Sequence, residues 1–214
     1  MDLKTLPDTL QKLAVSQKPK IIAIFCLFYA LIVLLMLVGS YAVISQNALG
    51  DWFILIGNWF GKAALTVFCI VLLPGIALRF RKSNKITGII MFYRRQLGIS
   101  VYLLGLLHLS IVWLSPKIVD QTPVLSLRLF EYFGLAAMLL MLPMFLTSNN
   151  FSQQKLGKWW KRIHRIIYVV AWLLFIHVAL QKSLWSILIG GMAVLEWSSL
   201  VYDFGRKRQK KISI

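Results

Sequence analysis

The chain has 214 residues, of which 59% are hydrophobic and only 14% are charged. This composition excludes an ordinary soluble globular protein, in which about 25% of residues are charged. A net charge of +17 would suggest nucleic acid binding in a soluble chain. Here the basic residues stand in short segments beside long apolar runs. Membrane topology therefore explains the charge, and nucleic acid is not an expected partner.

Six apolar runs give the chain its expected organisation. Each is long enough to cross a hydrocarbon layer about 30 Å thick at a helical rise of about 1.5 Å per residue. We predict spans at residues 21–44, 52–78, 96–114, 130–146, 163–180 and 184–202. The expected fold is an all-α integral membrane protein, a six-helix bundle in the lipid bilayer. This bundle occupies residues 21–204, between a polar tail at 1–20 and a basic tail at 205–214.

The lysines and arginines give the predicted bundle a direction. Twenty of the 24 lie in the N-terminal tail, in the connectors at 79–95 and 155–165, and in the C-terminal tail. The four on the opposite side are Lys62, Lys117, Arg128 and Lys182. Because cytoplasmic segments of membrane proteins carry the excess of positive charge, we expect both termini in the cytoplasm.

The three histidines of the chain fall in two predicted spans that run in the same direction. His108 lies in the third span, and His164 and His177 lie near the two ends of the fifth. Polar side chains are costly inside a bilayer and are functional by default. Two interpretations stay open. Each imidazole makes a hydrogen bond between helices, or it is an axial ligand of a haem inside the bundle.

The spacing of these histidines suggests how they pair. His164 and His177 are thirteen residues apart, a rise of about 20 Å, which would separate two haems across the membrane. Thirteen residues leave the two side chains on different helical faces, so a bulge, a kink or differently placed haems would be required. Arg94 precedes His108 by fourteen residues on nearly the same face. Parallel helices would then pair His108 with His177 and would set His164 opposite Arg94. Arg94 and Arg95 would either clamp haem propionates or anchor the membrane boundary.

Two further charged residues lie within predicted spans. Glu196, in the sixth span, could pair with a cation, serve a proton or quinone path, or form an ion pair with a lysine at the boundary. Lys62, near the non-cytoplasmic end of the second span, is expected to extend its ammonium group to the interface.

Six short motifs follow one another along the middle of the chain. They are GKAAL at 61–65, RRQLG at 94–98, LLHLS at 106–110, LTS at 146–148, LGKWWKRIHR at 156–165 and IHVAL at 176–180. On these motifs, over about residues 57–180, the chain resembles the ferric reductase-like transmembrane family. Within that family it is most similar to the haem-binding membrane subunits of periplasmic methionine-sulfoxide reductase systems.

The resemblance implies an electron conduit in the bacterial inner membrane. Electrons would come from a cytoplasmic flavin reductase or from membrane quinone and would pass through b-type haem. They would reach a periplasmic molybdopterin-containing methionine-sulfoxide reductase subunit that repairs oxidised methionines. Substrate chemistry would then belong to the partner, and no catalytic residue is expected in this chain.

The resemblance also assigns roles to single residues. His108, His164 and His177 stand at the family's three histidine positions, and Arg94 stands where eukaryotic relatives have a fourth histidine. This implies one or two haems, with His108 and His177 sharing one and His164 serving a second or an alternative site. FMN is a further cofactor that the resemblance admits, and no residue pattern in this chain locates it.

Two other functions are weighed against this one. The first is a ferric or other metal reductase of the same fold, acting directly on an extracytoplasmic acceptor. The second is a proton-coupled transporter or channel that uses the intramembrane histidines and Glu196. The concentration of histidines on parallel spans, without signs of an inverted repeat, favours the electron-transfer interpretation over the transporter.

Overall fold

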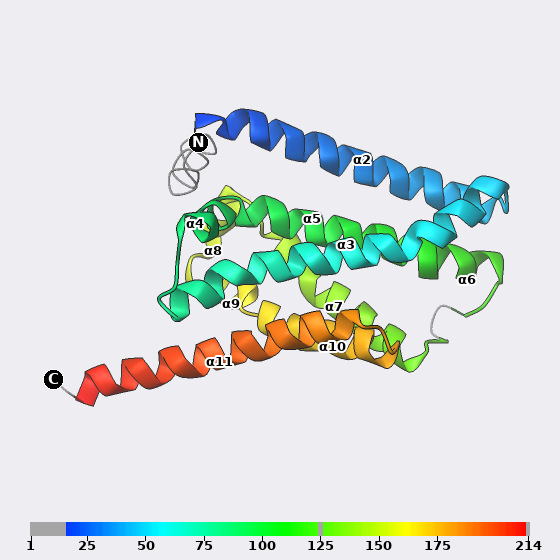
Figure 1. Ribbon diagram of the computed structural model, residues 1–214. Helices are drawn as coiled ribbons and strands as arrows, with labels where there is room; N and C mark the ends of the chain where they lie inside the picture. Colours follow the sequence, from blue (N-terminus) through cyan, green and yellow to red (C-terminus); the bar gives the residue numbers. More distant parts are fainter. Residues whose placement is uncertain (1–15, 124–125, 213–214) are drawn as a thin grey trace, which may run out of the picture.

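The computed structural model describes residues 16–123 and 126–212, and within them the regular secondary structure is helical (Figure 1). The helices are α2 (Lys18–Ile44), α3 (Ala48–Arg79), α4 (Lys85–Phe92), α5 (Arg94–Leu109), the π-helix η1 (Ser110–Leu114), α6 (Ser115–Val119), α7 (Leu129–Leu146), α8 (Asn150–Leu156), α9 (Lys158–His164), α10 (Ile167–Leu180) and α11 (Trp185–Ile212).

Six helical segments of the described chain are long and apolar enough to cross a membrane. They confirm the predicted all-α, six-span class. Their ends differ in places from the predicted ones. The third span continues past residue 114 to Val119, and α11 runs to Ile212 through residues that we expected to form a separate basic tail. The apolar runs alone therefore underestimate the lengths of these two helices, because both helices continue beyond the run.

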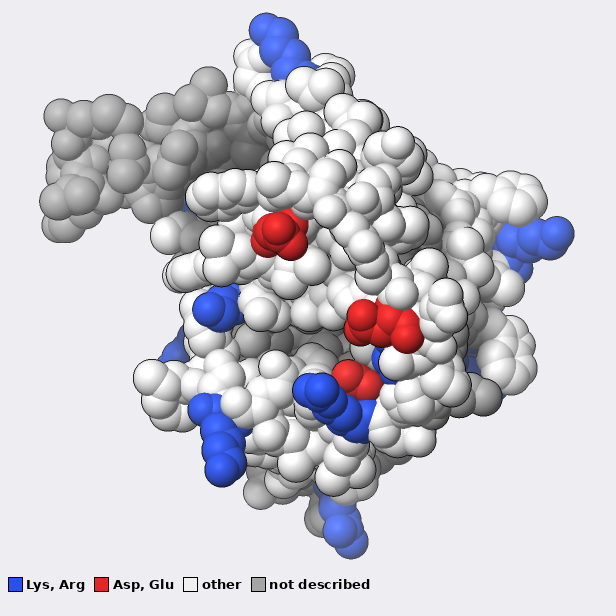
Figure 2. Space-filling view, turned by 90° about the vertical axis from the view of Figure 1, so that its right-hand side faces the viewer, with Lys and Arg blue, Asp and Glu red and all other residues white. Residues whose placement is uncertain are grey.

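Both described ends of the chain lie at the same end of the elongated bundle (Figure 1). We call this the terminal end (residues 80–95, 147–165 and 205–212), and it also holds α4, α8 and α9. The opposite, turn end holds residues 45–47, 120–123, 126–128 and 181–184. Figure 2 looks onto the turn end, where acidic side chains lie among the basic ones. The predicted orientation makes the terminal end cytoplasmic.

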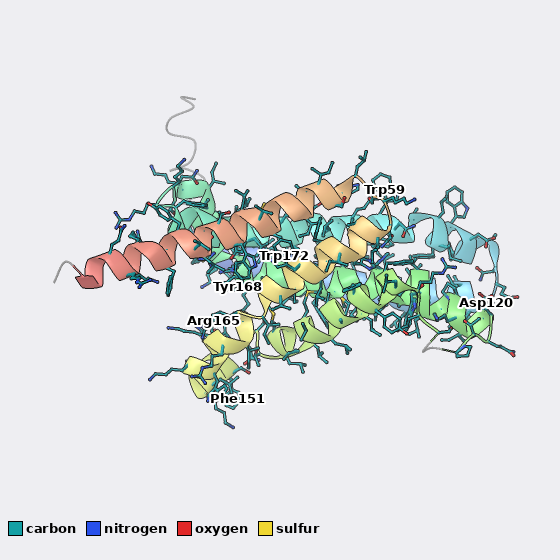
Figure 3. All side chains as sticks on the ribbon, turned by 90° about the horizontal axis from the view of Figure 1, so that it is seen from below. Trp59, Asp120, Phe151, Arg165, Tyr168 and Trp172 are labelled. Carbon is teal, nitrogen blue, oxygen red and sulfur yellow. The ribbon has the colours of Figure 1, made fainter. Side chains whose placement is uncertain are left out.

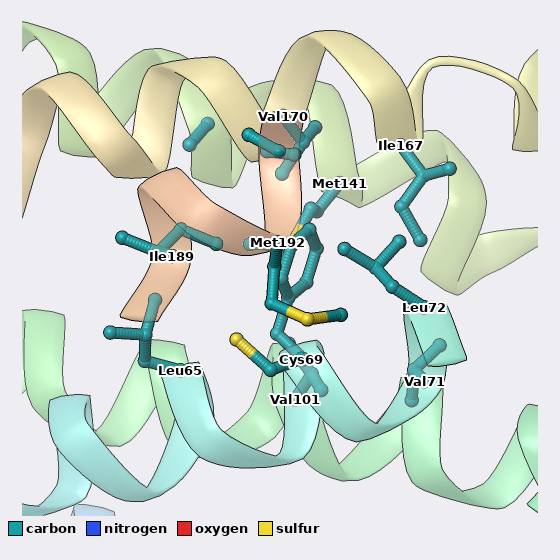
Figure 4. Close-up of a cluster of buried hydrophobic side chains, with 14 of the residues drawn as sticks. Leu65, Cys69, Val71, Leu72, Val101, Met141, Ile167, Val170, Ile189 and Met192 are labelled. Carbon is teal, nitrogen blue, oxygen red and sulfur yellow. The ribbon is translucent and has the colours of Figure 1, made fainter. Parts of the chain in front are cut away.

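The centre of the bundle is a close-packed apolar core. Side chains from α3, α5, α7, α10 and α11 meet there, among them Cys69, Val101, Met141 and Met192 (Figure 4). Helix association in lipid depends on such packing, since lipid tails are as apolar as the side chains. α2 lies on the outside, against α3 and α5, and exposes most of its apolar surface, as expected for a lipid-facing helix.

Two irregularities interrupt the spans that carry histidines. In the third span, η1 begins two residues after His108, and single π-helical turns within helices are frequent at functional sites. In the fifth span, Arg165 and Ile166 form a turn between α9 and α10. This break separates His164 from His177, so the two histidines do not lie on one continuous α-helix.

Candidate functional site

A pocket of about 440 Å³ opens inside the bundle near the turn end. His108 of α5 and His177 of α10 both line it, together with a predominantly apolar set of side chains that includes Phe68, Leu109 and Met138. The structure thus brings together two histidines that are 69 positions apart in the sequence. Each histidine is hydrogen-bonded to a helix other than α5 and α10: His108 to α3, and His177 to α7.

α3 holds His108 through two residues one helical turn apart. The Nδ1 of His108 lies 3.0 Å from the carbonyl oxygen of Gly57. Gly61 faces the same imidazole so closely that a β-carbon there would lie 3.1 Å from the ring. Because helical side chains lean toward the N-terminus, a side chain at position i+4 covers the carbonyl of residue i. Glycine at 61 therefore leaves the Gly57 carbonyl open to the histidine.

α7 holds His177 in the same way. The Nδ1 of His177 lies 2.8 Å from the carbonyl oxygen of Phe130, and the residue four positions later is Gly134. A β-carbon on Gly134 would lie 2.7 Å from that Nδ1, closer than side-chain carbons approach in proteins. The same arrangement of a carbonyl at i and a glycine at i+4 thus serves both imidazoles.

These hydrogen bonds determine the tautomer of both rings. A carbonyl only accepts, so each Nδ1 carries the proton and donates it, and each Nε2 keeps a lone pair. The Nε2 of His177 accepts a hydrogen bond from the amide of Gln181 at 3.0 Å. Each of the two imidazoles therefore makes an interhelical hydrogen bond through its Nδ1 and keeps on its Nε2 the lone pair that a metal ligand would need.

The chemistry of this donor set suits a metal held in a macrocycle better than a bare ion. Within the described residues, no group of three or more His, Cys, Asp or Glu side chains could hold a metal ion. Two neutral imidazoles whose Nδ1 protons are bound by carbonyls are the usual ligands of a six-coordinate b-type haem, and an apolar cavity between helices suits its plate. The pocket residues thus fit a haem.

Polar side chains gather at the rim of the pocket, toward the turn end. Those that line it are Asn58, Lys62, Arg128, Glu131, Gln181 and Ser183. Sequence reasoning treated Lys62 and Arg128 only as boundary charges. A signal was available for one of them, since Asn58 and Lys62 are four residues apart and share the helix face beside that of Gly57 and Gly61.

His164 lies apart from this pocket, at the terminal end. Its ring stacks on Trp160 with a centroid separation of 4.0 Å, and its Nδ1 lies 3.1 Å from the Trp160 carbonyl oxygen. It is half-buried and lies within electrostatic range of Arg94 and Arg95. The pairing of His164 with Arg94 stays a prediction.

Arg94 and Arg95 differ in their surroundings. Arg95 donates hydrogen bonds to Asn150 at 2.6 Å and to Gln153 at 3.0 Å, which fasten α8 to the start of α5. Arg94 is partly buried and lies within electrostatic range of Glu196, Tyr168 and Arg79. The hydrogen bonds of Arg95 give it a structural role in joining α8 to α5.

Glu196 pairs with an arginine rather than a lysine. Arg79 of α3 donates to Glu196 of α11 at 2.7 Å, to Ser199 at 3.0 Å and to the hydroxyl of Tyr168 at 2.5 Å. The Glu196 side chain is 3% exposed. Figure 3 shows Tyr168 on α10 beside α11, with α8 and α9 extending away around Phe151 and Arg165. This buried ion pair ties three spans together at the terminal end.

Comparison with known proteins places the chain in a family. The family model of the ferric reductase like transmembrane component matches residues 60–175, more than half of the chain. The chain belongs to this family. The matched region carries His108 and His164 and ends two residues before His177. It lies within residues 57–180, on which the resemblance was based.

Individual relatives match about half of the chain. The chain is 35% identical over 115 residues to the magnetosome protein MamZ of Magnetospirillum gryphiswaldense, covering 50% of this chain and 18% of that protein. It is 33% identical over 96 residues to the protein-methionine-sulfoxide reductase heme-binding subunit MsrQ of Rhizobium meliloti, covering 42% and 43%. It is 28% identical over 106 residues to MsrQ of Brucella ovis, covering 48% of each chain.

The chain thus spans less than half the length of each of these relatives. No solved structure matches it. Six membrane-spanning helices and membership in a membrane family of bacterial relatives identify it as a multi-pass protein of the bacterial inner membrane.

Proposed function

We propose that this ferric reductase-like protein is a haem-binding electron-transfer subunit that delivers electrons to a methionine-sulfoxide reductase on the periplasmic side. The observation that carries the proposal is the pocket with His108 and His177 on its walls, each with its Nδ1 bound to a carbonyl. The similarity to proteins named as heme-binding subunits of methionine-sulfoxide reductase supports the choice of acceptor.

In this proposal the chain's residues bind and orient the cofactor and leave substrate chemistry to the partner. His108 and His177 would hold the iron, and the carbonyls of Gly57 and Phe130 would fix the direction of both rings. A haem so bound supplies reversible one-electron redox chemistry. The apolar lining limits access of water, and Gln181 would give up its hydrogen bond to His177.

A second redox site at the terminal end is part of the proposal. His164 and Arg94 lie within electrostatic range of each other there, at the end that we expect in the cytoplasm from the distribution of positive charge. An electron donor, either a flavin reductase or membrane quinone, would act at this end, and the turn end would face the periplasmic acceptor. FMN remains an expectation from the family, and the arrangement of the described residues supports no particular place for it.

The domain limits follow the same proposal, with residues 21–204 as the electron-transfer bundle between two cytoplasmic tails.

A metal reductase that acts directly on an extracytoplasmic acceptor is the second candidate. The match to the ferric reductase like transmembrane component family favours it. Both candidates share the pocket and differ in what receives the electron.

An absorption spectrum of the purified full chain tests the proposal. Dithionite reduction should give the sharp α-band of a low-spin b-type haem, and His108→Ala and His177→Ala should each abolish the same component. A colourless protein would overturn the haem assignment. The rate of reoxidation then distinguishes the two acceptors. The reduced protein is mixed in one experiment with a periplasmic molybdopterin-containing reductase and methionine sulfoxide, and in the other with ferric citrate.

A further inference from the structure

Two cations at the rim of the pocket form no ion pair with another residue of the described chain. In the part of the chain that the structure describes, Arg79 pairs with Glu196, and Arg206 and Lys207 pair with Asp203, whereas neither Lys62 nor Arg128 lies in an ion pair. Both Lys62 and Arg128 line the pocket. The ammonium of Lys62 instead lies 4.2 Å from the centre of the Trp59 ring, which holds the long side chain in place.

The carboxylate at the rim, that of Glu131, forms no ion pair with either cation. Glu131 accepts a hydrogen bond from the backbone N–H of Arg128 at 2.9 Å, which commits it to the first turn of α7. There it satisfies one of the unpaired backbone donors of the helix N-terminus. The rim therefore keeps two positive side chains against one negative, beside a cavity whose inner wall is apolar.

This distribution of charge describes the ligand that would fit. The inner wall of the cavity is apolar, and its cations lie at the rim. Such a cavity suits a flat apolar molecule that bears negative groups along one edge. The positions follow from the chain, because Lys62 lies next to Gly61, which touches His108, and Arg128 lies two residues before Phe130, whose carbonyl binds His177. Both cations thus line the same pocket as the two imidazoles.

We propose that Lys62 and Arg128 form a carboxylate-binding rim that orients the cofactor and makes the pocket selective for a porphyrin with free carboxylates. The inference rests on the proposed function and extends it, because it assigns the polar edge of the cofactor to the turn end. Sequence reasoning had considered Arg94 and Arg95 for such a clamp. In the structure, Arg95 binds Asn150 and Gln153, and neither arginine lines this pocket.

The test compares two porphyrins in the detergent-solubilised full chain. Iron protoporphyrin IX and its dimethyl ester have the same plate and the same iron, but the ester lacks both negative charges. The unmodified chain should bind the ester roughly 10-fold or more weakly, the size expected for losing a charge-assisted hydrogen bond. In the double variant Lys62→Gln with Arg128→Gln the two porphyrins should bind equally. The single variant Lys62→Arg, which keeps the positive charge, should retain the preference for the free acid.

Lys182→Gln is the matched control. Lys182 lies at the same end of the bundle, is exposed and does not line the pocket. Its removal should leave the preference unchanged. The midpoint potential gives a second readout, because losing positive charge near the iron should lower it in the Lys62 and Arg128 variants alone. Size-exclusion profiles establish that each variant is folded.

The outcomes separate this inference from the proposed function. If the ester and the free acid bind equally to the unmodified chain, both with the histidine-dependent spectrum, the carboxylate-binding rim is wrong and the haem pocket stands. An equal loss of preference in Lys182→Gln would also refute it, since bulk charge would then suffice. If neither porphyrin gives a spectrum that depends on His108 and His177, both proposals fail together.

Discussion

Gly134 and His177 meet across the interface of α7 and α10 so closely that the helices leave no room for a β-carbon between them. A β-carbon at 134 would lie 2.7 Å from the Nδ1 of His177 and would cover the Phe130 carbonyl that this nitrogen binds. Gly61 and His108 repeat the relationship between α3 and α5, at 3.1 Å. The two glycines are therefore as much part of the pocket as the histidines.

Alanine at either glycine should disturb the pocket without removing a ligand. Gly134→Ala forces the His177 ring to shift, since the clash involves the ring itself, and Gly61→Ala does so less severely. We expect a large loss of bound haem or of its low-spin spectrum in Gly134→Ala and a smaller loss in Gly61→Ala. Gly98→Ala is the control, because nothing lies within 4 Å of that position on α5. Equal haem content in all three would contradict this role.

The Arg79–Glu196 pair should be costly to break from one side. Arg79→Met leaves the carboxylate of Glu196, whose side chain is 3% exposed, without its cation. Breaking a buried pair in this way costs roughly 3–5 kcal/mol of stability, whereas replacing both members by apolar residues is often close to neutral. Thermal or SDS unfolding should therefore show a large loss in Arg79→Met and recovery in Arg79→Met with Glu196→Leu.

The exposed pair on α11 provides the comparison for that experiment. Lys207 lies 2.6 Å from Asp203, and its side chain is 70% exposed. Exposed pairs contribute about 0–1 kcal/mol. Lys207→Gln should accordingly leave the unfolding midpoint nearly unchanged. If Arg79→Met were equally mild, the buried pair would have no special part in joining α3 to α11.

Substitutions at the terminal end should distinguish its two arginines. His164→Ala and Arg94→Ala are expected to remove the same component of the visible spectrum and to leave the His108–His177 component intact. Arg95→Ala should keep both components, because that side chain binds Asn150 and Gln153 on α8. Spectra recorded during a redox titration would separate the components. A change confined to His164→Ala would show that Arg94 has no part in the site.

Thiol labelling in intact spheroplasts tests the predicted orientation. The basic connectors are expected in the cytoplasm, so Ser83→Cys should react with a membrane-impermeant maleimide only after permeabilisation. Thr122→Cys, in the loop of the turn end, should react from outside. Both positions are exposed, and the control is the unsubstituted chain, whose Cys26 and Cys69 lie within spans. The reverse pattern would place the His108–His177 pocket near the cytoplasm.

Much of the architecture could be read from the chain because membrane insertion acts on local sequence. An apolar run must reach across the hydrocarbon layer and satisfy its own backbone, so six runs predict six helices. Helix ends were less predictable. The third span continues through Pro116 to Val119, because Pro116 falls in the first turn of α6, where its missing N–H is not needed.

Residue spacing also predicted which histidines could face one another, since rise and rotation per residue are properties of any helix.

The ion-pair partner of Glu196 could not be predicted from the sequence. Its cation, Arg79, lies 117 positions away on α3, in what had been counted as a connector. No local pattern connects the two residues, and only the packing of α3 against α11 brings them together.

The sequence by itself determined the class of this protein, its six spans, its expected orientation and the three histidines. These depend on composition and on helical periodicity, both of which are local. Only the tertiary structure decided that Gly57 with Gly61, and Phe130 with Gly134, hold the two imidazoles, and that Lys62 and Arg128 line the same pocket. Those contacts join different helices, and the way helices pack in a bilayer is set by the fit of whole surfaces.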